Sequence, residues 1–362
     1  VDWFFEITKE LARELNQKIK ITLLKCSQSK KDINKAFLSK NLFPLSNAPK
    51  ISSKKIINCT NIVGLAGVEQ ITEAINTKAD IIICGRSTDA SLIASLPIMN
   101  GVDKAVAWHA GKIGECGAFC TTNPKSGVIL ISFKKNGFFI KPVSNNTKVT
   151  PYTVSAHMVY ENSNPFTLIE PGGCLDVKKA IYKKQKDGSV YVTGANWVQD
   201  YNYKIKLEGT HVVGYQSISM VLIRDESYVK NINKWSKQIK NKVKEIIENS
   251  LSLKKKSYEI QFRFIGKNAT LGSLERKKLE PNEIGVLVVV TAKKQYECEE
   301  ISKILNPLLL HHSIYKNREL PTFSFPLSPP SFKIGKKYEF CLNHVMRLQN
   351  PMDIFKLEKY SI

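Results

Sequence analysis

Apolar and polar positions in the first hundred residues alternate between helical and strand spacing. Phe4, Ile7, Leu11 and Leu15 recur every three or four positions, which predicts a helix over 3–17. Further helices are expected at 68–76 and, after a loop at 85–89, toward residue 96, with strands at 19–24, 55–63 and 81–84. Because these strands are near-continuous apolar runs separated by helices, the pattern predicts a mostly parallel sheet with flanking helices.

The pattern changes after about residue 127. A hairpin is expected from 128–133 and 137–143, and Asp176 is a candidate cap for a helix through residue 184. The other expected elements are helices at 229–246 and 295–310 and strands at 189–193, 203–207, 212–223, 258–265, 284–291, near 323 and at 338–342. These longer strands indicate mixed or antiparallel pairing. We therefore expect an α/β domain at 1–140 and an α+β domain at 141–362.

The chain begins Val1-Asp2-Trp3 rather than with Met, and the first predicted helix starts almost at once. We expect from this that the first domain is truncated at its N-terminal side. The opening residues lack the basic segment and the small-residue cleavage site of a signal peptide. No apolar run approaches the roughly 18 residues of a membrane helix. The sequence therefore predicts a cytoplasmic protein with no membrane partner.

Charge and cysteine content refine this prediction. Lys and Arg number 54 against 32 Asp and Glu, a formal net charge of +22. The excess is mostly Lys spread along the whole chain, whereas proteins that bind bases and phosphates rely on Arg. We therefore expect no nucleic-acid partner. The eight cysteines form no C-x-x-C pair, and we expect reduced thiols rather than disulfides.

The segment Gly85-Arg86-Ser87-Thr88-Asp89 is the first candidate for chemistry. It lies between an apolar strand and a helix. Ligands of parallel sheets bind beyond the carboxyl ends of the strands, and a helix N-terminus attracts anions. Arg86 can bind a carboxylate or phosphate through two parallel hydrogen bonds. In the competing interpretation, Ser87 or Thr88 only caps the helix and Arg86 is solvated.

The signals for a cofactor or a metal are weaker. Gly64 and Gly67 mark a second strand-to-helix turn, but Gly-x-x-Gly falls short of a dinucleotide fingerprint. A tight turn and a ligand contact explain it equally well. His311 and His312 are adjacent, so on a helix they point in different directions and rarely share an ion. The sequence therefore indicates no metal and identifies no cofactor.

Residues 109–117 place three glycines among reactive side chains. His109, Lys112, Glu115 and Cys116 can act as base, electrostatic stabiliser, acid and nucleophile. A buried helix rarely carries so many glycines, each costing up to about 1 kcal/mol relative to Ala. We therefore expect the backbone to approach a ligand here. In the competing interpretation, Lys112 is on the surface and Cys116 is in the core.

Two shorter segments complete the set of candidates. Glu170 opens a Glu-Pro-Gly-Gly turn with Gly172 and Gly173, and we expect this turn to precede a helix. Lys206 and Glu208 are two positions apart on a predicted strand, so they project to the same face. We expect these segments to bind substrate or to assist its conversion. Either can equally be a salt-bridged structural element.

Longer strings resemble one known family. The chain is similar to the acyclic terpene utilisation (AtuA-like) family over about 61–340, in the segments 67–75, 79–89 (ADIIICGRSTD), 111–117, 160–173 (ending in EPGG), 206–209, 309–312 and 323–329. The resemblance implies a catabolic protein encoded beside acyl-CoA carboxylases, with a carbon–carbon lyase step on a branched 3-hydroxyglutaryl-CoA-type compound. It also implies a Gly-rich strand and further strand–helix units before the first helix, and in many relatives a small extra domain or partner. It supplies no catalytic residues.

We therefore expect an enzyme that acts on a small carboxylate or its CoA thioester and binds the substrate anion near Arg86. Glu115 or His109 would transfer protons, and Lys206 or Lys112 would stabilise developing enolate charge. The competing hypothesis is a non-catalytic subunit of a multienzyme complex, which would expose an apolar patch. We also expect a homo-oligomer, with a small partner domain or subunit as a further partner.

Overall fold

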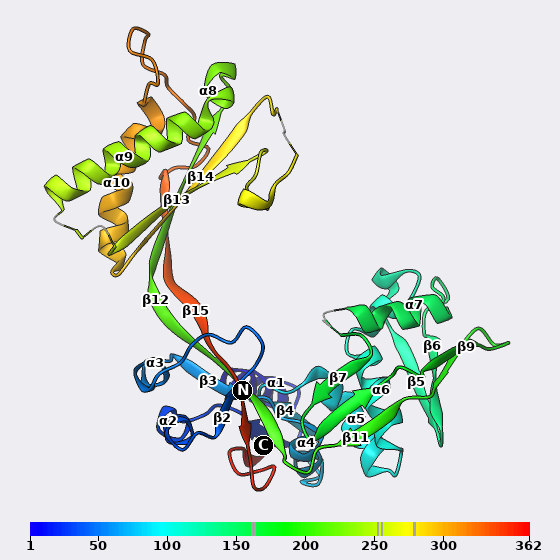
Figure 1. Ribbon diagram of the computed structural model, residues 1–362. Coiled ribbons are helices and arrows are strands. Elements are labelled where there is room, and N and C mark those ends of the chain that lie inside the picture. The colour runs from blue at the N-terminus through cyan, green and yellow to red at the C-terminus, as the bar shows by residue number, and fades with distance from the viewer. Residues whose placement is uncertain (161, 163, 252, 255, 278–279) are drawn as a thin grey trace. The chain divides into compact units, whose positions relative to one another are not determined.

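The computed structural model describes every residue of the chain except 161, 163, 252, 255 and 278–279 (Figure 1). It divides into two compact units. Unit 1 comprises Val1–His211 and Phe340–Ile362, and unit 2 comprises Val212–Glu339. Two long strands connect them along the chain: β12 (Lys204–Ile223) enters unit 2, and β15 (Ser331–Arg347) leads back into unit 1.

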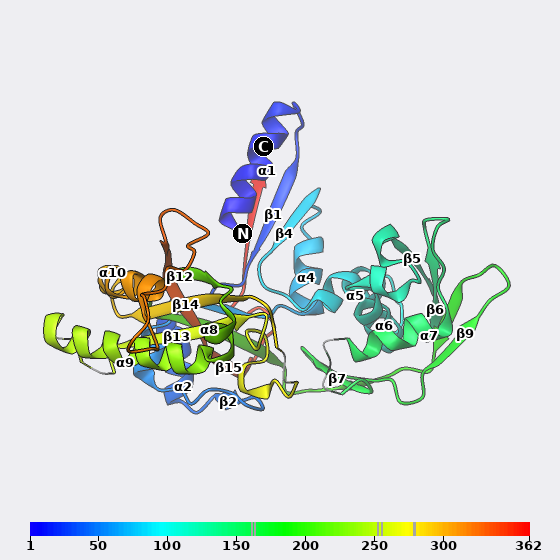
Figure 2. The same cartoon turned by 90° about the horizontal axis from the view of Figure 1, so that it is seen from above.

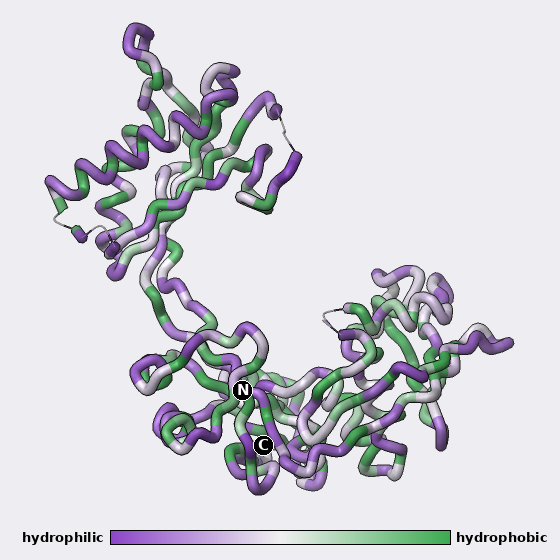
Figure 3. The backbone as a smooth tube through the Cα atoms, viewed as in Figure 1, coloured by the Kyte–Doolittle hydropathy of each residue, from purple (hydrophilic) through white to green (hydrophobic). Residues whose placement is uncertain are grey.

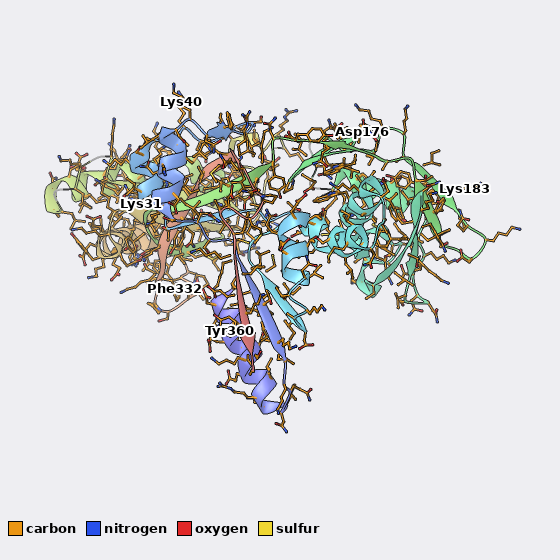
Figure 4. The ribbon with its side chains drawn as sticks, turned by 90° about the horizontal axis from the view of Figure 1, so that it is seen from below. Lys31, Lys40, Asp176, Lys183, Phe332 and Tyr360 are labelled. Atoms are coloured by element: carbon orange, nitrogen blue, oxygen red, sulfur yellow. The ribbon has the colours of Figure 1, made fainter. Side chains whose placement is uncertain are left out.

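A three-stranded sheet near the two termini belongs to unit 1. Its order is β16-β1-β4, with β1 (Lys20–Lys25) parallel to β4 (Ile81–Cys84) and antiparallel to β16 (Lys356–Ser361). Helix α1 (Asp2–Glu14) lies along β1 and β16 (Figure 2). Its buried Phe5 packs with apolar residues of β1 and β4 and contacts Tyr360, labelled on β16 in Figure 4.

The prediction of a mostly parallel sheet with flanking helices is wrong. β1 and β4 are the only parallel strands among the pairs whose register is described, and all the others are antiparallel. Strand β3 (Asn61–Gly64), expected in the parallel sheet, pairs antiparallel with β12. The residues before it form helix α3 (Ser53–Ile57), which the Ser52 side chain caps. An apolar run predicts a strand but not the strand that it pairs with, because contacts between residues far apart in the sequence decide the pairing.

Two antiparallel sheets make up much of the rest of unit 1. One has the order β5-β6-β10-β9 and the other β11-β8-β7. Their bounds are β5 Ile129–Lys134, β6 Gly137–Pro142, β7 Thr167–Glu170, β8 Gly173–Asp176, β9 Ile181–Lys184, β10 Val190–Thr193 and β11 Asn196–Gln199. The β5–β6 hairpin confirms its prediction. The remaining elements of unit 1 are α2 Lys30–Leu38, β2 Leu42–Pro44, α4 Val68–Ile75, α5 Asp89–Met99, α6 Lys104–Gly114, η1 Gly117–Cys120, η2 Pro124–Ser126, α7 Pro151–Ala156 and η3 His157–Val159.

The predicted helix between residues 176 and 184 is wrong. Asp176 ends β8, and its side chain accepts a hydrogen bond from the Lys178 backbone N–H at 2.9 Å. This local hydrogen bond stabilises a turn rather than a helix start. Ile181 and the residues after it then pair with β10, and Figure 4 labels Asp176 and Lys183 on their strands.

Unit 2 consists of a sheet with helices on one of its faces. Its order includes β13-β14-β12, with β13 at Tyr258–Ile265 and β14 at Ile284–Ala292. Buried residues of α9 (Ile232–Ser250) and α10 (Gln295–His311) pack against alternate residues of β12 and β14. Figure 3 shows hydrophobic and hydrophilic stretches alternating along α9, as its sequence spacing predicts. The other helices are α8 Glu226–Lys230 and η4 Gly272–Leu274.

In the part of the chain that the structure describes, no helix is both long enough and apolar enough to cross a membrane.

Candidate functional site

Three backbone segments that are far apart in sequence lie side by side in unit 1. The Leu65 N–H donates to the Lys206 carbonyl oxygen at 2.9 Å, and the Ala66 N–H donates to that of Arg86 at 3.0 Å. The Thr88 N–H donates back to the Ala66 carbonyl oxygen at 3.0 Å. The turn at 64–67 therefore lies between the 85–89 segment and β12, and three of the predicted segments converge.

The first group of charged side chains, here called the Arg86 cluster, comprises Arg86, Asp89, Lys206 and Glu208. Arg86 Nε lies 3.2 Å and Lys206 Nζ 2.7 Å from the Glu208 carboxylate, while Arg86 Nη1 is 3.9 Å from Asp89. The Arg86 side chain is 45% exposed. Burial disfavours ionised Glu208, but hydrogen bonds and charges from Lys206 and Arg86 outweigh this effect and lower its pKa. An incoming anion would compete with two carboxylates for Arg86.

Helix α6 corrects the expectation that the glycines of 109–117 serve ligand approach. α6 is buried over most of its length. A Cβ on Gly111 would lie 2.4 Å from the Ala90 carbonyl oxygen of α5, and one on Gly114 would lie 2.9 Å from Ile93 and Ile131. The structure gives these glycines a packing role, since only a hydrogen side chain lets α6 approach α5 and β5 so closely.

His109 lies in the packed interior rather than among the other candidates. Its Nε2 is 3.1 Å from the Tyr182 hydroxyl, and its ring meets Phe138 edge-on. Burial lowers the pKa of His109 to about 3, so the imidazole is neutral at physiological pH. These contacts fit a core histidine better than a proton-transfer group.

Lys112, in the last turn of α6, and Glu115, the residue that caps the C-terminus of this helix, form a buried ion pair. Each side chain is only 10% exposed. This placement overturns the interpretation of Lys112 as a surface residue. Removing either partner would take one charge of this pair away from a poorly solvated position, which is strongly destabilising in buried ion pairs.

Glu170 ends β7, and a tight hairpin rather than a helix follows it. Glu170 pairs with Gly173 across the β7–β8 turn, and Gly172 has φ +80°. Pro followed by a positive-φ glycine is the arrangement of a type II turn. The turn packs on the 64–67 segment, where a Cβ on Gly67 would lie 2.6 Å from Pro171 Cβ. Both glycine-bearing segments therefore position Glu170.

Among the described carboxyl groups of unit 1, that of Glu170 has the most strongly shifted pKa. Burial raises its pKa to about 7, and the Thr88 hydroxyl opposes the rise. The negative charges of Glu115 and Asp89 contribute to this rise, whereas the positive charge of Lys112 opposes it. Oε2 of Glu170 and Oγ1 of Thr88 are buried and have no hydrogen-bond partner among the described residues. Near neutral pH this carboxyl group can therefore both take up and release a proton.

His157 is a member of this site that the sequence did not identify. It is 3% exposed, and neither ring nitrogen has a hydrogen-bond partner among the described residues. Its pKa is lowered to about 4, chiefly by burial and also by the positive charge of Lys112, while the Lys112 backbone opposes this effect. A single His in an apolar stretch matches no motif, so only its place in the fold reveals it.

We call Thr88, Lys112, Glu115, His157 and Glu170 the Glu170 cluster. It holds four of the eight buried side-chain nitrogen and oxygen atoms that lack a partner in the described residues. Buried polar groups are normally paired, because leaving one unsatisfied costs about 1–3 kcal/mol. The concentration of such atoms in one cluster indicates a place where a polar ligand binds. No three His, Cys, Asp or Glu side chains are grouped to hold a metal among the residues described.

The fold and this cluster define a mixed α/β protein whose larger unit carries buried acid–base groups. The profile described as "Acyclic terpene utilisation family protein AtuA" matches residues 4–316, and the chain belongs to this family. Membership supports a part in acyclic terpene utilisation and confirms the suspected resemblance. Neither the curated proteins nor the solved structures yielded a match.

Proposed function

We propose that this protein is an enzyme of acyclic terpene breakdown that cleaves a carbon–carbon bond in a small branched 3-hydroxy carboxylate or its CoA thioester. The observation that carries the proposal is Glu170. Its carboxyl group has a pKa of about 7, has an unpartnered buried oxygen, and lies near the Lys112–Glu115 ion pair. Proton-transfer groups work best when their pKa lies near the working pH.

In this mechanism, Glu170 in its carboxylate form takes the proton of the substrate 3-hydroxyl group. The C2–C3 bond breaks, C3 becomes a carbonyl carbon, and the bonding electrons pass to C2 and the neighbouring carbonyl group as an enolate. The Lys112 ammonium group stabilises this negative charge, because a fixed charge in a poorly solvated site acts strongly. Glu170 then returns the proton to C2, which completes the cycle.

The geometry favours these roles over those expected from the sequence. Glu115 is already the ion-pair partner of Lys112, and His109 is hydrogen-bonded within the interior. Lys206 lies in the more exposed Arg86 cluster. Arg86 remains our proposed contact for the carboxylate or the CoA end of the substrate, in competition with Glu208.

Turnover of branched 3-hydroxy acids and their CoA thioesters, followed by mass spectrometry of the carbonyl product, tests this proposal. We expect Glu170→Gln to lower turnover by about 100-fold or more and Glu170→Asp to retain part of it. Glu73→Gln, at an exposed position of α4, is the matched control. Turnover of the Gln variant at the wild-type rate, or no cleavage of any member by the wild type, would contradict the assignment.

A second candidate is the non-catalytic subunit, and one observation favours it. Trp3, Phe4, Leu11 and Leu15 of the α1 segment each have half or more of their surface exposed. Such a patch is typical of a surface that binds a partner or a second copy of the chain. Native mass measurements on the wild type and on Leu11→Glu test it. Monomeric, partner-free protein in both cases would remove this candidate.

We also propose a cytoplasmic location for the enzyme. All eight cysteines are free, although Cys59 Sγ and Cys341 Sγ are only 3.4 Å apart. A reducing compartment would maintain such a pair as thiols. Reaction with a thiol reagent after unfolding, without prior reduction, should count eight groups. A lower count would argue against this location.

A further inference from the structure

Three rings follow one another from the Glu170 cluster to the surface of unit 1. The His157 and Tyr160 rings are stacked, with centroids 5.5 Å apart and planes 18° apart. The Tyr160 and Phe119 rings are 5.4 Å apart and tilted by 45°. His157 is buried, whereas Phe119 is 52% exposed. The row therefore leads from a buried polar end to an accessible apolar end.

The two ends of the row have different chemistry. Neither His157 nitrogen makes a hydrogen bond of normal geometry with a described residue, although the Lys112 backbone is close enough to affect the His157 pKa. A neutral imidazole can donate one hydrogen bond and accept another. The faces of Tyr160 and Phe119 offer apolar surface but no fixed charge, and aromatic side chains dominate the energetics of such contacts. A ligand that satisfies both ends must carry a polar head and an apolar chain.

We propose, resting on the function proposed above, that this row selects the substrate. His157 hydrogen-bonds the carboxylate or carbonyl end of an amphiphilic acid, while Tyr160 and Phe119 pack against its apolar chain. The polar end is then held within the Glu170 cluster, next to the group that transfers the proton. Phe119 lies on η1, the element that comes next in the chain after α6, so the apolar contact is close in sequence to the helix that carries Lys112.

Calorimetric binding of butyrate, hexanoate, octanoate and the branched C10 acid geranate to the full chain tests this selection without any turnover. In the wild type we expect affinity to rise about two- to four-fold per added methylene group, as expected for burial of apolar surface. Phe119→Ala and Tyr160→Ala should each lower this increment by half or more. Tyr160→Phe keeps the ring and should keep the increment. Tyr152→Ala, an exposed aromatic of α7, is the control.

Substitutions of His157 test the polar end of the row. His157→Phe should weaken every acid by the same factor, about five- to ten-fold, the loss expected for one hydrogen bond. His157→Asn, which retains an N–H, should recover part of that loss, while the exposed His311→Phe of unit 2 should have no effect. Thermal melts of each variant establish that it is folded.

The outcomes separate this inference from the proposed function. Three results would overturn the proposal that this row selects the substrate. The first is a gain in affinity per methylene group that is unchanged in both Phe119→Ala and Tyr160→Ala. The others are wild-type affinity in His157→Phe, or no binding of any acid by the wild type up to the solubility of the acid. If the binding results hold but Glu170→Gln turns over at the wild-type rate, the row stands and the catalytic role of Glu170 falls. If Glu170→Gln is inactive but the gain in affinity per methylene group does not change when either ring is removed, only the proposed role of the ring row is wrong.

Discussion

The Glu170 cluster and the Arg86 cluster contain the same kinds of charged groups but place them in different surroundings. Lys112 and Glu115 are each 10% exposed, whereas Arg86 is 45% exposed. In the first cluster burial dominates and raises the pKa of Glu170 to about 7. In the second, neighbouring positive charges dominate and lower the pKa of Glu208. Solvent access, more than residue type, decides which cluster holds a transferable proton.

The largest expected effect concerns the buried ion pair. Lys112→Met removes the positive charge that pairs with Glu115 in a poorly solvated position, so we expect the free energy of unfolding to fall by about 3–5 kcal/mol. Arg86→Met, its counterpart in the exposed cluster, should cost at most about 1 kcal/mol. Urea denaturation measures both. Equal losses would erase the contrast between the clusters, and Lys112→Met combined with Glu115→Leu should recover much of the larger loss.

The next effect is the dependence of stability on pH. The folded pKa of Glu170, about 7, lies above its ordinary value of 4.5, so the protonated group favours the folded state. Its contribution is complete below pH 4.5 and is lost as the pH rises through about 7. Relative to Glu170→Gln, the wild type should therefore lose on the order of 2–3 kcal/mol between pH 4.5 and pH 8.

Urea denaturation of both proteins at several pH values within this range and below it checks the sign as well as the size. A difference that stays constant with pH would mean that the carboxyl group titrates normally. A difference that grows in favour of the wild type only as the pH rises toward 4.5 would mean that Glu170 is held ionised, as Glu208 is.

The smallest effect belongs to Glu208. Its pKa is lowered in the folded state, so its contribution is present above its ordinary pKa of 4.5 and is lost as the pH falls through the folded value. Because its partners Arg86 and Lys206 are substantially exposed, Glu208→Gln should cost below about 1 kcal/mol at pH 7, and less at high salt. A loss of several kcal/mol that is insensitive to salt would place this cluster with the buried one.

Much of the local structure follows from the sequence. The apolar spacing predicts α9 and α10, and the apolar runs predict β4, β13 and β14, because each pattern is a property of neighbouring residues. The prediction that Lys206 and Glu208 project to one face is likewise local, and they form an ion pair. The site segments at 64–67, 85–89 and 206–208 were recognisable for this reason.

The sequence by itself determined which residues carry charge and where helices and strands form. Only the tertiary structure decided that β3 pairs with β12, that the Pro171–Gly172 turn rests on Gly67, and that His157 lies beside Lys112. These contacts join residues far apart in the chain, and they bury the Oε2 atom of Glu170, a residue that is partly exposed as a whole. A carboxyl group's pKa depends on such burial and on the surrounding charges. The chemistry of Glu170 therefore belongs to the fold rather than to the Glu-Pro-Gly-Gly sequence that contains it.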